Sequence, residues 1–258
     1  MRIARFTAEN ELYFGRVDGE PGEERLTVLA GDPFYTGITP TQKSFALEDV
    51  RLVAPIIPRS KIVGVARNWH DHAAELGNET PTSPQLFLKP NTSVAGPGDP
   101  VTLPESSETI SFEGELAVVI GRMCKSVPVE RVPEVVFGYT CANALTARDL
   151  QKSDLQWARA KGFDGACPLG PWIQTELETE DLSIRTWLEG DLKQDGTTGD
   201  MIFGVAELVS FVSEAFTLLP GDVILTGTPA GVGLVRDGEE VEIEIEGIGA
   251  LTNRMRRA

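Results

Sequence analysis

The sequence predicts an α+β protein in which β-strands dominate. Short segments rich in Val, Ile and Leu recur along the chain, and glycine or proline bounds most of them, which is typical of strands that end in turns. The clearest helical spacing of apolar residues covers 205–216. Strands and helices do not alternate regularly, and the sequence contains no internal repeat. The pattern therefore does not favour a doubly wound parallel sheet.

The chain divides near residue 58 into a small first part and a larger second part. Three short strands are expected at 2–6, 12–17 and 26–29, and a fourth at 50–54. The following Pro55-Ile56-Ile57-Pro58 cannot continue a central strand, because proline donates no amide hydrogen bond. We therefore predict a small N-terminal β domain at 1–58 and a catalytic domain at 59–258.

The second part contains the longer apolar segments. Residues 77–110 are rich in Pro, Thr, Ser and Gly, and an irregular stretch of this length is usually a functional loop or lid. In a helix expected at 148–160, Leu150, Leu155 and Trp157 are predicted to face the core. Strands are expected at 61–65, 115–121, 184–188, 223–225 and 241–245, and helices at 67–76, 148–160 and 205–216.

Composition limits the partners of the protein. The chain has 258 residues, and 23 Lys and Arg against 39 Asp and Glu give a net charge of -16. Such a surface repels nucleic-acid phosphates and anionic lipids, so we expect neither nucleic acid nor membrane as a partner, and a small molecule instead. Three widely spaced cysteines indicate neither a disulfide framework nor a zinc site. No segment resembles a signal peptide, and the predicted location is cytoplasmic.

Both histidines of the chain lie in His70-Asp71-His72, and Glu75 follows three residues later. If this stretch is helical, His72 and Glu75 share a face, so the carboxylate can orient the imidazole while its free nitrogen takes a proton from water. An exposed polar helix face explains the same pattern. Both interpretations stay open.

Glu113 and Glu115 are expected on one face of a strand, because side chains alternate along strands. Mg²⁺ and Mn²⁺ prefer carboxylate oxygens of this kind. The acids at 242, 244 and 246 have the same spacing, but they alternate to the end of their segment and are expected to face solvent. The apolar run at 117–120 instead indicates a buried strand, so the earlier pair is the candidate metal site.

Two further segments could bind an anion. Arg148 could attract an anionic substrate or form a structural ion pair with Asp149, and the sequence leaves both open. The glycine-rich stretch 221–233 could offer backbone amides and the Thr228 hydroxyl to a carboxylate.

Five segments occur in a distinctive order and spacing: Phe112-Glu113-Gly114-Glu115-Leu116, 138–151, Lys161-Gly162-Phe163-Asp164, Met201-Ile202-Phe203 and 220–233. In that order and spacing they resemble the fumarylacetoacetate hydrolase family, over about residues 61–254. The resemblance implies a mixed β-sandwich roll, a homodimer, one divalent cation (Mg²⁺ or Mn²⁺, with Ca²⁺ as a further option) and a small anionic 2-oxo acid or 1,3-dicarbonyl substrate.

The resemblance also implies roles for single residues. Glu113 and Glu115 match two metal ligands, whereas the third ligand position, normally an aspartate, is Ala144 here. Either the chain tolerates two carboxylates with water in the gap, or the alanine is an engineered loss of a ligand. The remaining roles are His72 and Glu75 as a water-activating pair on a lid, Lys161 as a site lysine, and Arg67, Lys89, Gln151 and Thr228 as substrate-binding residues.

The expected function is metal-dependent cleavage of a carbon–carbon bond in a small 2-oxo or 1,3-dicarbonyl acid through a metal-stabilised enolate. Oxaloacetate decarboxylation and acylpyruvate hydrolysis are the leading reactions. One alternative is an isomerase or decarboxylase of aromatic-catabolism intermediates of the 2-hydroxyhepta-2,4-diene-1,7-dioate type. Another is a catalytically silent binding protein, because Ala144 replaces an acidic ligand. The presence of His72, Glu75 and Lys161 favours an enzyme.

Overall fold

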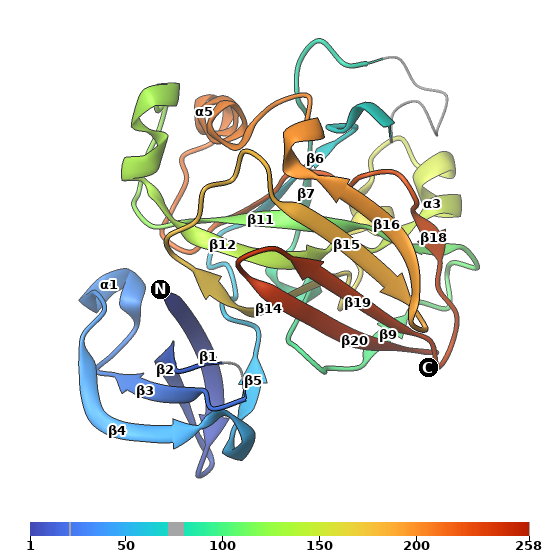
Figure 1. Ribbon diagram of the computed structural model, residues 1–258. Coiled ribbons are helices and arrows are strands. Elements are labelled where there is room, and N and C mark those ends of the chain that lie inside the picture. The colour runs from blue at the N-terminus through green and yellow to red at the C-terminus, as the bar shows by residue number, and fades with distance from the viewer. Residues whose placement is uncertain (21, 72–79, 258) are drawn as a thin grey trace.

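A 12-stranded sheet runs through the computed structural model, which describes residues 1–20, 22–71 and 80–257 (Figure 1). Its order is β4-β3-β2-β1-β14-β12-β11-β17-β6-β7, with β5 beside β1 and β8 beside β14. The strands are β1 (Arg2–Ala8), β2 (Glu11–Asp18), β3 (Arg25–Leu29), β4 (Pro40–Ala46), β5 (Arg51–Val53), β6 (Ile62–Ala66), β7 (Gln85–Lys89), β8 (Val94–Ala95), β11 (Gly114–Ile120), β12 (Val136–Asn143), β14 (Cys167–Gln174) and β17 (Val223–Leu225).

A second sheet of five strands packs against the middle of the first, as Figure 1 shows. Its order is β16 (Asp191–Thr197), β15 (Ser183–Leu188), β19 (Glu240–Ile245), β20 (Gly249–Arg257) and β9 (Val101–Leu103). A third, small sheet consists of β13 (Thr146–Ala147), β10 (Ile110–Phe112) and β18 (Gly233–Leu234). The helices are α1 (Pro33–Thr36), α3 (Arg148–Ser153), α4 (Ala158–Lys161) and α5 (Val205–Ala215), with 3₁₀ turns η1 (Leu47–Asp49), η2 (Asn91–Ser93), η3 (Val129–Glu134) and η4 (Thr198–Asp200).

The main core lies between the two large sheets. Leu116, Val118 and Ile120 point from β11 into this core, where they join Ile243 and Ile245 of β19. The intervening Ala117 and Val119 belong to a second buried cluster on the opposite face of β11. Alternation along a strand that is buried on both sides explains the continuous apolar run at 116–120. The predicted β-rich α+β class is confirmed.

The N-terminal strands form a unit with its own apolar core, in which Phe6 and Leu26 are fully buried. The unit is joined to the rest of the molecule through the sheet, because Arg2 and Ile3 of β1 pair with Gln174 and Ile173 of β14. The strands predicted at 2–6, 12–17 and 26–29 are all present. The proline-bounded segment 55–58 lies between β5 and β6 and is not part of any strand.

Two local predictions are wrong. The described part of 77–110 is not an irregular loop, because it contains β7, β8, β9 and the first residue of β10. The stretch 148–160 is not one helix either: α3 ends where Asp154 turns to an extended conformation, and α4 begins only at Ala158. As a consequence Leu155, which was expected in the core, is fully exposed.

The described helices are all too short or too polar to cross a lipid bilayer.

Candidate active site

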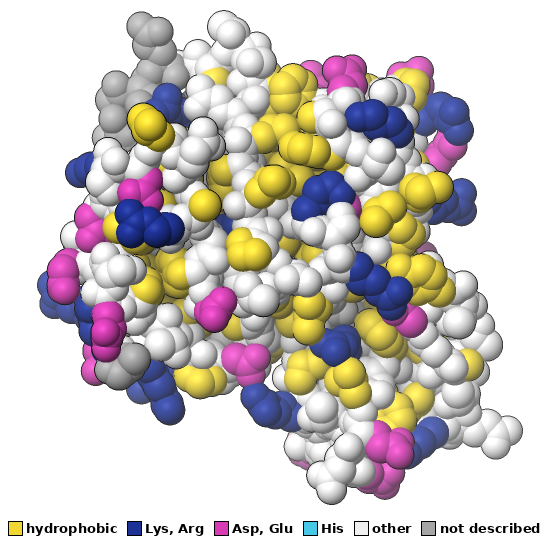
Figure 2. All heavy atoms as spheres, turned by 180° about the vertical axis from the view of Figure 1, so that it is seen from behind, with side chains coloured by type: hydrophobic (Ala, Val, Ile, Leu, Met, Phe, Trp, Pro, Cys, Tyr) yellow, Lys and Arg dark blue, Asp and Glu magenta, His cyan; other side chains and the backbone are white. Residues whose placement is uncertain are grey.

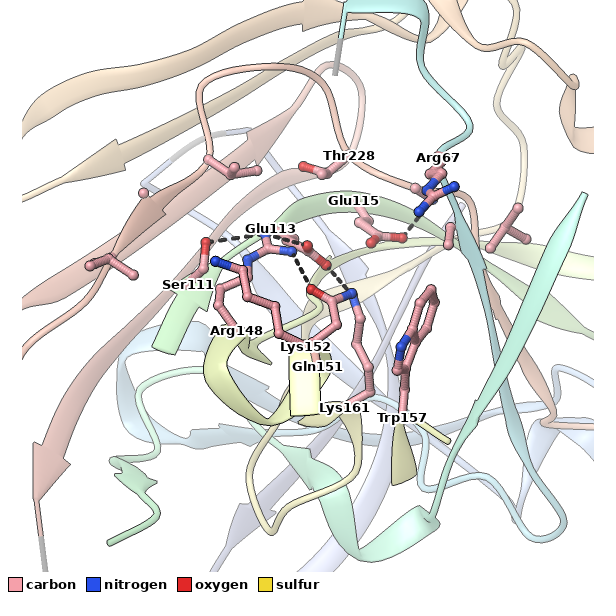
Figure 3. Close-up of a pocket in the computed structure, with 16 residues that line it drawn as sticks. Arg67, Ser111, Glu113, Glu115, Arg148, Gln151, Lys152, Trp157, Lys161 and Thr228 are labelled. Carbon is pink, nitrogen blue, oxygen red and sulfur yellow. Dashed lines mark hydrogen bonds and ion pairs between the residues drawn. The ribbon is translucent and has the colours of Figure 1, made fainter. Parts of the chain in front are cut away.

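A cavity of about 530 Å³ lies where the large sheet meets the small sheet, α3 and α4 (Figure 3). Segments that are far apart in the sequence contribute its wall. The end of β6, the β10–β11 junction and the loop after β17 meet the two short helices there. The lining residues are Val65, Ala66, Arg67, Ser111, Glu113, Glu115, Arg148, Gln151, Lys152, Trp157, Lys161, Gly227, Thr228, Val232, Gly233 and Leu234.

Glu113 and Glu115 reach this cavity together and are almost completely buried, with 3% and 2% of their surface exposed. The Glu113 carboxylate accepts hydrogen bonds from Arg148 Nη2 at 2.6 Å and from Lys161 Nζ at 2.7 Å. Figure 3 shows both basic side chains converging on it. A buried carboxylate requires such partners, since an isolated buried charge is very unfavourable.

Glu115 has different surroundings, because its Oε2 accepts a hydrogen bond of 2.6 Å from the backbone N–H of Gly227. Burial, and secondly the negative charge of Glu113, raise the pKa of the Glu115 carboxyl to about 8. In the absence of a bound cation, these surroundings favour the protonated form of Glu115. A divalent cation would displace that proton, because metal ligands must be deprotonated.

Lys161 is held in place by an aromatic ring as well as by Glu113. Its Nζ lies 4.7 Å from the centroid of the Phe87 ring, which is within the range of a cation–π interaction. Phe87 can occupy this position only because residue 64 is glycine: a Cβ there would lie 2.1 Å from the ring. The glycine in β6 thus positions the ring that supports Lys161.

Lys89 does not contact the cavity, which changes the role predicted for it. Its ammonium group is buried and donates to the carbonyl oxygens of Leu145, Lys161 and Ala166 at 3.2, 2.5 and 2.8 Å. An ammonium group has three donors, so these bonds leave none for a substrate. Burial lowers the pKa of Lys89 to about 8. Lys89 therefore positions the chain around Lys161 rather than binding substrate.

Arg148 pairs with Glu113, and its Nη1 donates to Gln151 Oε1 at 3.1 Å. The alternative that Arg148 forms an ion pair with Asp149 is wrong. The Asp149 carboxylate instead accepts hydrogen bonds from Ser107 Oγ and from the Glu108 amide. Arg148 and Gln151 lie one turn apart on α3, which explains why both reach the cavity.

Arg67 and Thr228 line the opposite wall. Arg67 follows β6 in a left-handed conformation, with φ of 58°. Such a conformation is uncommon for a residue with a side chain and ends the strand at this point. Thr228 follows Gly227, whose φ of 88° lets the backbone turn toward Glu115. The structure thus brings four predicted substrate-binding or catalytic residues, Arg67, Gln151, Lys161 and Thr228, to one cavity.

Ala144 lies beside the carboxylates but carries no oxygen. Its N–H donates to the carbonyl of Glu113 at 2.8 Å, and its methyl group belongs to the buried cluster that contains Ala117 and Ala142. Ala142 pairs with Glu115 in the sheet, so Ala144 is the diagonal neighbour of Glu115 on the same face. No group of three or more His, Cys, Asp and Glu side chains in the described ranges could hold a metal ion.

The residues present nevertheless fit a divalent cation that takes much of its coordination from water and substrate. Mg²⁺ is often held by only one or two carboxylates. Glu113 and Glu115 supply two, and the adjoining cavity has room for water and a small ligand. Burial and the adjacent Glu113 charge, which raise the pKa of Glu115, also favour a compensating positive charge at this position.

His72 and Glu75, the predicted proton-transfer pair, lie outside the described residues. Among the described residues, sequence reasoning did not assign Ser111 or Lys152 to the cavity and expected Trp157 in the core, yet all three line it. The Ser111 hydroxyl lies 3.3 Å from Arg148 Nη2. Ser111 directly precedes the Phe112-Glu113 segment, and that adjacency is the only local signal that could have revealed it.

Two models of protein families match the chain. Residues 61–256 match the C-terminal domain of fumarylacetoacetate (FAA) hydrolase, and residues 1–55 match an N-terminal domain described as Rv2993c-like. Protein Rv2993c of Mycobacterium tuberculosis is 49% identical over 98% of this chain and 97% of its own length. The oxaloacetate tautomerase YisK of Bacillus subtilis is 40% identical over 82% of this chain and 75% of its own length.

Solved structures of similar proteins also match the chain over its whole length. The 2-hydroxyhepta-2,4-diene-1,7-dioate isomerase of Mycobacterium marinum is 46% identical, with a TM-score of 0.92 over 100% of this chain and 98% of its own. The maleylpyruvate hydrolase of Sphingobium sp., solved with manganese(II) and pyruvate, is 30% identical, with a TM-score of 0.81 over all of both chains. These relatives are enzymes, which supports an enzymatic role for this chain, and one of them binds a divalent metal.

Proposed function

The chain belongs to the fumarylacetoacetate hydrolase family, and on that premise we propose that it is a divalent-metal-dependent enzyme that forms the enolate of small 2-oxo dicarboxylic acids. Oxaloacetate is the first substrate to test. One observation carries the proposal: two buried carboxylates, Glu113 and Glu115, share a cavity with the cationic groups of Lys161, Arg148 and Arg67. Such a site combines ligands for a hard cation with positive charge for an anion.

Glu113 and Glu115 would hold the cation, which would stabilise negative charge on the substrate oxygens as a Lewis acid. Lys161 lies 2.7 Å from Glu113 and adds a second positive charge at the same place. Arg67, Gln151 and Thr228 orient the carboxylate and carbonyl groups of the substrate from the opposite sides of the cavity. Preorganised charges of this kind act where negative charge develops in the transition state.

The proton is proposed to move through His72, with Glu75 orienting the imidazole. In tautomerisation, His72 would exchange a proton with the carbon next to the carbonyl group. In acylpyruvate hydrolysis it would take a proton from the attacking water, whereas decarboxylation of oxaloacetate requires no water. The three reactions share the enolate, so the same described residues serve each of them.

Isomerisation of a 2-hydroxyhepta-2,4-diene-1,7-dioate is a second candidate function. The solved isomerase that is 46% identical over the whole chain favours it. Such a substrate also carries a 2-oxo acid group in its keto form, so Glu113, Glu115 and Lys161 would have the same roles. The longer substrate would extend farther along the cavity toward Trp157 and Leu234, which also line it.

The decisive experiment compares four reactions with Mg²⁺, Mn²⁺ or Ca²⁺ and with a chelator. Keto–enol exchange of oxaloacetate, pyruvate release from oxaloacetate, pyruvate release from acetylpyruvate and isomerisation of the dienedioate are measured side by side. We expect metal-dependent turnover of oxaloacetate, and loss of it in Glu115→Gln. If no metal supports any of the four, the alternative of a silent binding protein is correct and the proposed function is wrong.

We also propose which kinds of partner the protein binds and which it does not. The net charge of -16 supports a small anionic substrate that is attracted by local cations, and opposes nucleic-acid and membrane partners. We propose a homodimer in the cytoplasm, since closed two-fold dimers are the commonest soluble oligomers.

A further inference from the structure

Gln194 is a fully buried polar residue that has no role in the proposed function as described above. It lies in β16, in the second sheet, yet the hydrogen bonds of its side chain all reach segments that form the cavity. Its Oε1 accepts from the N–H of Gly114 at 3.0 Å, and its Nε2 donates to Thr228 Oγ1 at 2.7 Å and to the Pro229 carbonyl at 2.9 Å. One side chain thus links the segment of the two carboxylates to the glycine-rich loop.

The two backbone partners determine which way the amide of Gln194 points. The Gly114 N–H is only a donor and must face the amide oxygen, whereas the Pro229 carbonyl is only an acceptor and must face the amide nitrogen. The reversed orientation would place two donors against each other and two acceptors against each other. Because the amide is fully buried, no solvent water can relieve such contacts.

This orientation determines the polarity of the Thr228 hydroxyl. An amide nitrogen cannot accept a hydrogen bond, so Thr228 Oγ1 is the acceptor in its contact with Gln194, and its own hydrogen points elsewhere. Thr228 is buried and lines the cavity, and no residue in the described part of the chain accepts that hydrogen. The hydroxyl is therefore a directed donor toward the cavity.

We infer that Gln194 is a positioning residue that fixes Thr228 as a hydrogen-bond donor to a carboxylate or carbonyl oxygen of the substrate. The inference rests on the proposed function only in taking an oxygen-rich anion as the ligand. The loop that carries Thr228 is docked on the same strand, because a Cβ at Gly231 would lie 2.0 Å from the carbonyl of Lys193. Gln194 and Thr228 thus keep a fixed relation to each other.

The test is a double-mutant cycle with oxalate, a planar dianion, as the probe. Its affinity is measured by calorimetry in the presence and absence of Mn²⁺. Gln194→Glu keeps an acceptor for Gly114 but replaces the donor, so Thr228 would turn its hydrogen toward the new carboxylate. We expect oxalate binding to weaken about 10- to 100-fold, the usual size for losing a hydrogen bond to a charged group.

The Thr228→Val background separates this effect from the added negative charge. In Thr228→Val the new carboxylate still repels oxalate. This background has no hydroxyl at residue 228, so no hydrogen can turn away from the ligand. We therefore expect Gln194→Glu to weaken binding much less in Thr228→Val than in the unmodified chain or in Thr228→Ser, which keeps the hydroxyl. An equal weakening in all three backgrounds would overturn the inference.

Gln194→Met covers the case in which Gln194→Glu does not fold, because it has a similar length and also removes the donor. It should weaken oxalate binding only where a hydroxyl is present at residue 228. Failure of the unmodified chain to bind oxalate under either condition would also overturn the inference. Normal oxalate binding without turnover of oxaloacetate would instead contradict the proposed function and leave the role of Gln194 intact.

Discussion

Glu113 and Glu115 lie two residues apart and have different electrostatic surroundings. Glu113 forms ion pairs with two cationic side chains. Glu115 accepts a hydrogen bond from a backbone amide, and for its carboxyl group the effects of burial and of the Glu113 charge outweigh the more distant positive charges of Lys161 and Lys89. Two neighbouring carboxyl groups in different surroundings commonly have different protonation states. The strand pattern predicted that they share a face. The strand pattern could not predict that their surroundings differ, because the groups that contact the two carboxylates come from α3, α4 and the loop after β17.

The protonation of Glu115 leads to a prediction about stability and pH. Its folded-state pKa of about 8 is above the ordinary value of 4.5, so the folded protein binds this proton more tightly than the unfolded chain does. The contribution is complete below pH 4.5 and is lost as the pH rises through about 8. The melting temperature of the metal-free protein should therefore fall over this range.

Glu115→Gln is the control for this prediction, because it removes the titration while keeping the shape. The fall in melting temperature between pH 5 and pH 8 should be smaller in this variant, and Mn²⁺ should stabilise the unmodified protein more as the pH rises. If the melting temperature changes equally with pH in the two proteins, Glu115 is ionised throughout this range.

Ala144 allows a test of the metal site. Ala144→Asn and Ala144→Asp add nearly equal volume to the same buried position, but only the aspartate adds a charge. We expect Ala144→Asp to bind Mn²⁺ at least about 10-fold more tightly than the unmodified chain, by analogy with the cost of losing a supporting metal partner. Without metal it should be less stable than Ala144→Asn, because three carboxyl groups would be close together.

Calorimetric titration with Mn²⁺ and melting temperatures with and without metal give both results. If the aspartate binds no more tightly than the asparagine, residue 144 is not a ligand position.

His72 was predicted from its spacing to Glu75. His72→Ala should lower acylpyruvate turnover by roughly 10² to 10⁴, the size of a general-base contribution, and should lower decarboxylation of oxaloacetate less, because no attacking water is needed there. His70→Ala is the matched control, since His70 is an exposed residue two positions away. Equal activity of the two folded variants on acylpyruvates would exclude His72 as the base.

At the scale of elements, regular patterns predicted some strands and failed for others. The strands of the N-terminal part and helix α5 follow clear alternation or helical spacing, and both are present. β14 was missed because it contains two prolines and a glycine, and β20 because five of its nine residues are polar. Each also pairs with a strand that is distant in the sequence, β14 with β1 and β20 with β9, and only tertiary contacts reveal these partners.

The same limit explains the errors and omissions at the site. Lys89 follows an apolar island next to a proline, and nothing in that sequence indicates three carbonyl partners from residues 145–166. Gln194 lies in a strand of alternating polar residues that resembles an exposed hairpin, yet it is completely buried. The carboxylate pair and Lys161 could be predicted because the resemblance preserves their local segments.

The glycine-rich loop gives a prediction for an element as a whole. Gly231→Ala introduces a Cβ that would lie 2.0 Å from the Lys193 carbonyl, so the loop must move away from β16. Activity should fall by at least about 10-fold, because misplacing a positioning group by about 1 Å can cost 100-fold. The variant is assayed on oxaloacetate together with its melting temperature.

Gly238→Ala is the matched control. Both glycines have positive φ, of 94° and 84°, but the space around Gly238 is open. The two substitutions therefore impose similar backbone strain, and only one forces a collision. If both lower activity equally, strain rather than loop docking is responsible.

At the scale of the whole molecule, one face carries a broad group of apolar side chains with Lys and Arg among them (Figure 2). Among the described residues, Leu155 is fully exposed and Leu88 is about half exposed. Together with Leu86 and Phe216 they line a groove of about 510 Å³. Exposed apolar surface of this kind commonly marks a protein interface.

We expect the groove to be covered by a second copy of the chain in the proposed homodimer. Leu155→Glu should shift the dimer toward monomer in sedimentation experiments at micromolar concentration, because a charge would be buried at the interface. Leu192→Glu is the control, as Leu192 is about half exposed and lies away from the groove in β16. A dimer that both substitutions leave unchanged would place the interface elsewhere.

The junction between the N-terminal unit and the rest of the sheet limits how cooperatively the molecule unfolds. Only two residue pairs connect β1 with β14, and the unit buries its own Phe6 and Leu26. The other contacts across this junction are mainly between side chains, such as Phe34 against Phe137 and Arg2 against Trp172, so we expect the unit to open as a separate foldon while the carboxylates of β11 stay in place. A single melting temperature would then combine two unfolding events, that of the N-terminal unit and that of the part that contains the cavity. Only a probe located near the cavity would report the second event alone.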